Sequence, residues 1–140
     1  MRRHHKIAFV LLFIAFCGTS RAQQPQMETQ ALGKVIEILT IDVKPGKRDQ
    51  FHKIYQSQAL PLLRKWKFDV VAYGPSLHDA NSYYVIRSFK SLDERQTSED
   101  AYYNSDDWRK GPREAILALV DHFAYTVFPA ERLKEIAKQL

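Results

Sequence analysis

The sequence predicts an α+β domain in which four strands form an antiparallel sheet and helices cover one of its faces. Two observations carry this prediction. Four short segments are rich in β-branched and aromatic residues, and two longer segments with helical spacing of apolar residues lie between them. The resulting order, βαββαβ, is that of the ferredoxin-like fold. A further helix is expected at the C-terminal end.

The first expected strand covers residues 34–43, KVIEILTIDV. Both of its faces are largely apolar, with Ile36 and Ile38 on one and Leu39 and Ile41 on the other, beside a single charged residue, Glu37. A strand with one face in water alternates more cleanly than this. We therefore expect helices on one face and a second copy of the chain on the other, which makes a homodimer of the dimeric α+β barrel type.

The middle of the chain predicts a turn, a helix and two more strands. Lys44-Pro45-Gly46 is typical of a turn. Residues 51–66 carry apolar side chains at steps of three and four. Pro61 interrupts this helix because it lacks a backbone N–H, so we expect a kink or break at residues 57–60. The second and third strands are expected over residues 69–73 and 82–89.

After the third strand, Ser91 and Glu94 have the spacing of a capping box, which predicts a helix start. This helix is expected to fade at residues 102–104, and Ser105 has the features of a second N-terminus. Pro112 suits the first turn of a further helical segment. The fourth strand is expected over residues 119–128. The last helix is expected over residues 129–140, with an apolar stripe that comprises Leu133, Ile136, Ala137 and Leu140.

The N-terminal segment resembles an export signal. Basic residues at the start precede an uninterrupted apolar run from Ile7 to Cys17, which is too short to span a bilayer comfortably. Ser20-Arg21-Ala22 matches a cleavage site for a signal peptide. We therefore expect residues 1–22 to be removed, residues 23–33 to form a flexible linker, residues 34–128 to form the domain, and the protein to be periplasmic or secreted.

Removal of this leader changes the charge and the cysteine content. The full chain has 21 basic and 16 acidic residues, and four of the basic ones but none of the acidic ones lie in residues 1–22. The remainder carries a formal charge of only +1, which gives no support to a nucleic-acid or membrane partner. The single cysteine, Cys17, also leaves with the leader, so disulfides, thiolate catalysis and cysteine-bound metal are excluded for the mature chain.

Candidate site residues come from the histidines and the aromatic set. No two histidines have metal-ligand spacing, so no metal site is expected. His122 lies in the fourth strand beside small residues that can leave room for a ligand. An aromatic-lined pocket between sheet and helices would suit a flat apolar ligand, although core packing explains the same aromatics. The candidate ligand-binding residues are His122, Tyr84, Tyr73, Trp66 and Trp108.

Charged residues on the strands are expected to be paired, because a buried charge without a partner is costly. Arg87 and Asp121 lie in the third and fourth strands and can face each other across the sheet or the interface. Arg95 is expected to pair with carboxylates at its helix start or with Glu99. We assign these groups a structural role.

Three segments together resemble the NIPSNAP family, within the dimeric α+β barrel superfamily. Residues 36–46 are similar to the family's first strand and its Lys-Pro-Gly turn, and residues 61–63 to its mid-helix Pro-Leu-Leu. Residues 81–95, followed by Trp108, are similar to its hairpin and Ser-Leu-x-x-Arg helix start. The resemblance covers residues 34–128 and implies the ferredoxin-like fold and a homodimer.

The family has no defined reaction, so the resemblance does not name an activity. We expect an exported homodimer that binds a small apolar or aromatic ligand, with no cofactor and no catalytic residue assigned. The alternative is a monooxygenase of the dimeric α+β barrel type that works without a cofactor or with haem. A third reading is a purely structural interaction module, which a solid interior without a pocket would favour.

Overall fold

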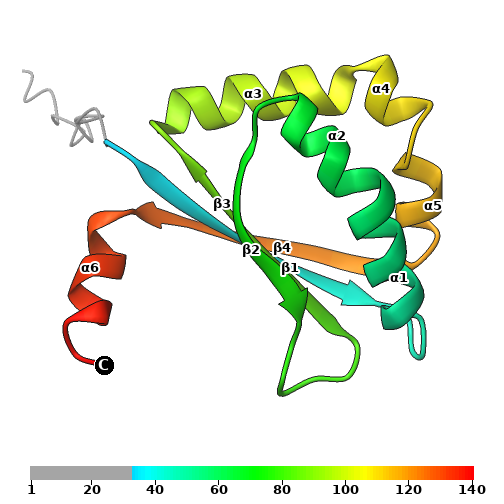
Figure 1. Cartoon of the computed structure of the whole chain (residues 1–140), viewed down its shortest axis with the longest axis horizontal. Coiled ribbons are helices and arrows are strands. Elements are labelled where there is room, and N and C mark those ends of the chain that lie inside the picture. Colours follow the sequence, from blue (N-terminus) through cyan, green and yellow to red (C-terminus); the bar gives the residue numbers. More distant parts are fainter. Residues whose placement is uncertain (1–32) are drawn as a thin grey trace, which may run out of the picture.

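The structure is a computed structural model that describes residues 33–140. The expected leader, residues 1–22, and nearly all of the expected linker lie outside the described residues. Figure 1 shows a twisted sheet with the helices α1 to α5 on one side of it and the last helix, α6, set apart at the end of β4. No helix within residues 33–140 is long and apolar enough to cross a membrane.

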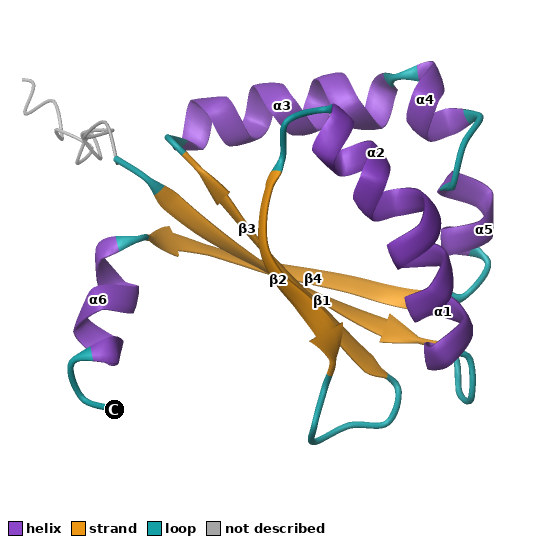
Figure 2. Cartoon of the chain, viewed as in Figure 1, coloured by secondary structure: helices purple, strands orange, loops and turns teal. Residues whose placement is uncertain are grey.

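The elements follow the order expected from the sequence. The strands are β1 (Val35–Val43), β2 (Asp69–Pro75), β3 (Ser82–Phe89) and β4 (Val120–Pro129). The helices are α1 (Arg48–Ile54), the π-helical segment η1 (Tyr55–Ala59), α2 (Leu60–Lys65), α3 (Leu92–Asn104), α4 (Asp106–Arg109), α5 (Arg113–Leu117) and α6 (Glu131–Ala137). Figure 2 separates the two kinds of element by colour.

The sheet confirms the predicted α+β fold. Its strand order is β2-β3-β1-β4, and all three neighbouring pairs are antiparallel. The two central strands, β1 and β3, pair with each other although they are far apart in the sequence. Strand β4 lies at an edge of the sheet. This is the ferredoxin-like arrangement that βαββαβ connectivity produces.

The register of the strands sorts their side chains onto two faces. Glu37 pairs with Arg87 on β3 and with Val127 on β4, and these three residues face the helices. Ile38 pairs with Ile86 and with Thr126, and these face away from the helices. We call these the helix face and the open face of the sheet.

The break expected near Pro61 is present as the π-helical segment η1. In an α-helix each backbone N–H donates to the carbonyl four residues earlier, and proline has no N–H to donate. The chain forms wider, π-helical turns just before Pro61. Phe51, Tyr55, Ala59 and Leu63 follow at steps of four and are all buried. In an uninterrupted α-helix each such step drifts by about 40°, so the wider turns keep these side chains on the sheet.

Two serines begin the helices of the second half as expected. The Ser91 hydroxyl accepts a hydrogen bond from the backbone N–H of Glu94 at 3.0 Å, and the Glu94 carboxylate accepts one from the N–H of Lys90. Ser105 accepts one from the N–H of Trp108 at 3.2 Å. These side chains satisfy N–H groups that have no partner inside a helix.

The open face is only partly apolar in a single copy of the chain. Ile36 is buried and Ile38 and Ile86 are half-buried, whereas Thr40 and Asp42 at the other end of β1 are exposed. Helix α6 has no buried residue and exposes Leu133 and Ile136 from the stripe expected in the sequence. The apolar part of this face thus lies at the end of the sheet near α6.

Candidate functional site

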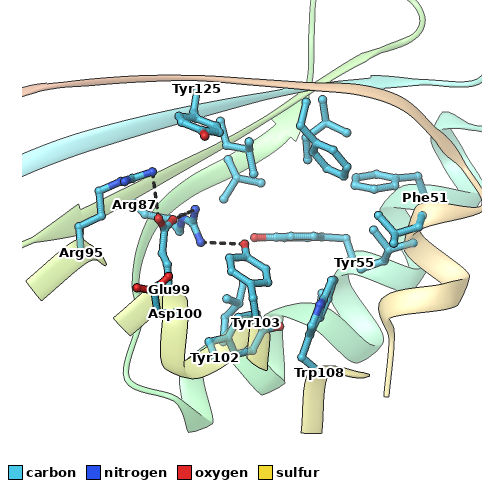
Figure 3. Close-up of a pocket in the computed structure, with 18 of the residues that line it drawn as sticks. Phe51, Tyr55, Arg87, Arg95, Glu99, Asp100, Tyr102, Tyr103, Trp108 and Tyr125 are labelled. Carbon is cyan, nitrogen blue, oxygen red and sulfur yellow. Dashed lines mark hydrogen bonds and ion pairs between the residues drawn. The ribbon is translucent and has the colours of Figure 1, made fainter. Parts of the chain in front are cut away.

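A cavity of about 480 Å³ lies between the helix face of the sheet and the helices. Its size falls within the range of small-molecule sites, about 300–1,000 Å³. Its wall combines apolar, aromatic and charged side chains from every layer of the domain (Figure 3). The lining residues are Leu39, Ile41, Phe51, Tyr55, Ala59, Leu63, Val85, Arg87, Arg95, Gln96, Glu99, Asp100, Tyr102, Tyr103, Trp108, Ile116, Leu117, Phe123 and Tyr125.

The apolar part of the wall comes from β1, α1 and the π-helical segment. Phe51 and Tyr55 stack with ring centroids 6.1 Å apart, and both face the sheet. Ala59 follows one π turn later, and its small side chain leaves space that a larger one would fill. The break caused by Pro61 therefore also positions the tyrosine that reaches into the cavity.

The charged part of the wall is a buried network of two arginines and two glutamates. Glu37 is completely buried, and its two carboxylate oxygens accept hydrogen bonds from Arg87 and Arg95 respectively. Glu99 on α3 accepts from Arg87 at 2.6 Å and pairs with Arg95 at 2.9 Å. Because both arginines meet both carboxylates, the network is neutral overall when the two glutamates are ionised.

Burial raises the pKa of the Glu99 carboxyl to about 6. Loss of water around the carboxylate is the largest cause, and repulsion from Glu37 adds to it. Arg87 and Arg95 oppose the shift without cancelling it. The network therefore contains one carboxylate that takes up a proton just below neutral pH.

Two tyrosine hydroxyls bring hydrogen-bonding capacity to the cavity. Tyr55 is 5% exposed, and its buried hydroxyl has no hydrogen-bond partner within the described part of the chain. The Tyr103 hydroxyl accepts a hydrogen bond from Arg87 at 3.3 Å. Burial raises the pKa of Tyr55 well above its usual value, with Arg87 partly opposing the shift, so the hydroxyl keeps its proton.

The mouth of the cavity lies at the edge strand β4. Four lining residues are among the exposed large apolar side chains of the described chain, and Tyr125 is the most exposed of these at 64%. The others are Tyr103, Leu117 and Phe123. The guanidinium of Arg95 lies 5.3 Å from the ring centroid of Tyr125, which links the charged network to the mouth. Exposed apolar groups around an opening are typical of ligand and protein contact sites.

Of the five residues predicted as ligand-binding, the structure places only Trp108 in the cavity wall. His122 is exposed on the open face opposite Asp42, and Tyr84 lies on the same face. The Tyr84 hydroxyl is so close to Gly74 that a Cβ there would lie 3.3 Å from it.

The other two candidates, Tyr73 and Trp66, are half-buried on the helix side without reaching the cavity. The ring of Tyr73 lies 5.3 Å from that of Tyr55. The Trp66 indole N–H donates to Asp107 at 3.0 Å. Whether any of the five binds a ligand stays a prediction.

The polar residues that line the cavity were not predicted as a site. The expected pairing of Arg95 with Glu99 is present, but Arg87 pairs with Glu37 and Glu99 and not with Asp121. Asp121 is exposed on β4. The one signal in the sequence was a glutamate on an otherwise apolar strand face, which indicates a buried cationic partner.

The described residues form no metal-ligand group, and the cavity offers haem no histidine, cysteine or methionine as an axial ligand. Within residues 33–140, no group of three His, Cys, Asp or Glu side chains is placed to hold a metal ion. Haem iron takes an axial His, Cys, Met or tyrosinate, and no His, Cys or Met lines the cavity of the described chain. Tyrosines do line it, but burial raises the pKa of Tyr55 and Tyr102 and keeps both protonated.

The family model described as NIPSNAP matches residues 36–127. A search of the curated proteins found no match. Solved structures with the same fold include a NIPSNAP domain protein from Burkholderia xenovorans, with a TM-score of 0.62 and 17% identity over 67% of this chain and 91% of that chain.

Two further structures widen this set. A NIPSNAP family protein from Agrobacterium tumefaciens has a TM-score of 0.64 and 19% identity over 69% of this chain and 87% of that chain. A protein from Caulobacter crescentus, provisionally named an antibiotic biosynthesis monooxygenase, has a TM-score of 0.54 and 19% identity over 71% and 92% of the two chains. At such identities the likeness shows the fold alone.

Proposed function

The chain belongs to the NIPSNAP family, as its sequence pattern indicates, and on that premise we propose that it binds a small apolar or aromatic molecule in the cavity beneath its helices. The observation that carries this proposal is the cavity itself. It measures about 480 Å³, its wall is mostly apolar and aromatic, and its mouth exposes apolar side chains at β4. A solid interior would have favoured a purely structural module.

An apolar fluorescent probe tests the proposal. N-phenyl-1-naphthylamine becomes brighter when it leaves water, and it should bind with saturation. Ala59→Leu extends a side chain into the cavity and should weaken binding at least tenfold while the protein stays folded. Ala101→Leu makes the same change at an exposed position of α3 and serves as the matched control. Equal binding by the two variants would contradict a site in this cavity.

We also propose that two copies pair through the open face of the sheet. The support is the apolar end of that face, where Ile36, Ile38 and Ile86 lie, together with the exposed Leu133 and Ile136 of α6. Sedimentation at micromolar concentration should give a dimer, and Ile86→Glu should shift it to monomer. A wild-type monomer under these conditions would refute the pairing.

Export is proposed on the sequence pattern of residues 1–22. The chain made in a host with a signal peptidase should begin at Gln23, which mass spectrometry of the intact protein can measure. Fractionation of the cells then distinguishes the periplasm from the medium. A chain that keeps its first residues and stays in the cytoplasm would overturn this proposal.

A second candidate function is oxygenation of the bound molecule without a cofactor. Its support is the shared fold with the Caulobacter protein and a cavity that shields an aromatic ligand from water. A shared fold hosts many activities, so the assignment depends on a measurement. Oxygen uptake with 1-naphthol, above the rate without protein, would establish it, and no uptake would leave ligand binding as the function.

A further inference from the structure

The hydroxyl of Tyr55 is one of two in the cavity wall, with that of Tyr102, that are buried without a hydrogen-bond partner in the described chain. Tyr55 is only 5% exposed, and its hydroxyl has no hydrogen-bond partner in the described chain. A buried hydroxyl without a partner lowers stability, and such groups are uncommon in folded proteins. Figure 3 shows the hydroxyl end of Tyr55 pointing toward the side of the cavity where Arg87 and Tyr103 lie.

The surroundings of this hydroxyl favour donation over acceptance. The guanidinium of Arg87 donates to the oxygen of Tyr103 at 3.3 Å, which leaves the Tyr103 proton free to donate. Burial raises the pKa of Tyr55 and the positive charge of Arg87 only partly opposes this, so the Tyr55 hydroxyl keeps its proton. Both hydroxyls therefore have a proton that they can donate to an oxygen lone pair.

The charge of the site indicates that this oxygen is neutral. Arg87 and Arg95 are each paired with Glu37 and Glu99, so no cation is left over for an anionic group. A ligand cation would find no free carboxylate in the same network, and the further carboxylate of the wall, Asp100, is exposed and accepts a hydrogen bond from Gln96 at 2.9 Å. An uncharged carbonyl oxygen accepts hydrogen bonds without changing this balance.

We propose that the cavity takes a flat apolar molecule that carries a neutral carbonyl oxygen, an aromatic ketone or quinone, and that the Tyr55 hydroxyl donates to that oxygen with Tyr103 as the second donor. This assignment rests on the proposed ligand-binding function and adds the chemical class of the ligand. The aromatic wall around Phe51 and Trp108 holds the body of the molecule. The hydroxyls fix the orientation of its polar end.

A pair of ligands of similar size separates the contribution of the hydrogen bond from that of the apolar contacts. 2-Acetylnaphthalene carries a carbonyl oxygen that 2-isopropylnaphthalene replaces with a methyl group. Calorimetry should show that the wild-type protein binds the ketone about tenfold more tightly, the effect of one well-formed hydrogen bond at about 1.4 kcal/mol. Tyr55→Phe should lose most of this preference, because Tyr103 then remains as the sole donor, and its affinity for the hydrocarbon should be unchanged.

Tyr83→Phe is the matched control, because its hydroxyl is also buried but is paired with the His52 ring at 2.7 Å and does not line the cavity. It should keep the preference for the ketone. Tyr55→Phe should also be at least as stable to urea as the wild type, since it removes a hydroxyl that has no partner, so loss of folding does not confuse the result.

The outcomes separate this inference from the proposed function. Equal binding of both ligands by the wild type, or a preference that is undiminished in Tyr55→Phe, would overturn the assignment of a carbonyl acceptor and leave the apolar site in place. Failure of both ligands and of N-phenyl-1-naphthylamine to bind would overturn the site as a whole.

Discussion

The two faces of the central sheet are built from the same four strands, yet they bury very different groups. On the helix face, Glu37 and Arg87 lie at the centre of an ion network and beside a cavity. On the open face of the same two strands, Ile38 and Ile86 occupy the neighbouring register position. At this position of the sheet a charged pair is buried inside the subunit, while the apolar pair on the other face of the same strands stays half-buried at the surface.

This arrangement shows that side-chain polarity alone does not tell which face of a strand is the interior. A charged group can lie inside when it is paired, and here β3 supplies Arg87 while α3 supplies Arg95 and Glu99. Apolar residues stay at the surface when a second surface covers them. The following predictions test this contrast, beginning with the largest expected effect.

Removal of one charge from the buried network should have the largest effect on stability. Glu37→Gln leaves Arg87 and Arg95 short of a counter-charge in a buried site, so the free energy of unfolding should fall by about 3–5 kcal/mol. Asp42→Asn, on the open face of the same strand, should change it by less than about 0.5 kcal/mol. Urea denaturation measures both. Similar losses for the two variants would contradict the distinction between the faces.

Truncation of neighbouring isoleucines compares the packing of the two faces. Ile41→Ala, at a buried position of the helix face, should lower the free energy of unfolding by about 2–5 kcal/mol. Ile38→Ala, at a half-buried position of the open face, should lower it by about 1 kcal/mol in the monomer. If a second copy covers Ile38, this loss grows with protein concentration. A loss independent of concentration would count against pairing through this face.

The cap of α3 determines where this helix begins and hence how its charged residues meet Glu37. Ser91→Ala removes the hydroxyl that accepts from the Glu94 N–H and should lower the free energy of unfolding by about 1 kcal/mol. Ser98→Ala, inside the same helix, is the control and should not destabilise the protein, because alanine is the better helix former. Thermal denaturation followed by circular dichroism resolves this difference.

The raised pKa of Glu99 predicts a pH dependence of stability between about 4.5 and 6. The folded protein binds this proton more readily than the unfolded chain does, so protonation of Glu99 stabilises the fold as pH falls through this window. Its contribution to stability is therefore lost as pH rises toward 6 and above. Glu99→Gln should remove this slope from a plot of the free energy of unfolding against pH. A slope as steep as that of the wild type would refute the shift in pKa.

Local chemistry made the elements predictable. Pro61 indicated the helix break, Ser91 and Ser105 indicated two helix starts, and the β-branched and aromatic residues of 82–89 indicated β3. Each of these signals acts within a few residues, where steric effects and backbone hydrogen bonding decide the outcome. The element order then restricted the topology to the ferredoxin-like arrangement.

The cavity could not be predicted in the same way. Trp108 was the only candidate in its wall, whereas His122 lies on the other side of the sheet. Alternation along β4 places His122 and Tyr125 on opposite faces of the sheet, but it does not say which face the helices cover. That choice depends on the packing of segments from several parts of the chain.

The sequence by itself determined the strands, the helix starts and the fold, because these follow from the conformational preferences of neighbouring residues. Only the tertiary structure decided that Glu37 meets Arg87, 50 residues away, and that Tyr55 reaches the cavity without a partner. Pairing across a sheet depends on register, and a shift of one residue would turn every side chain of the strand to the opposite face.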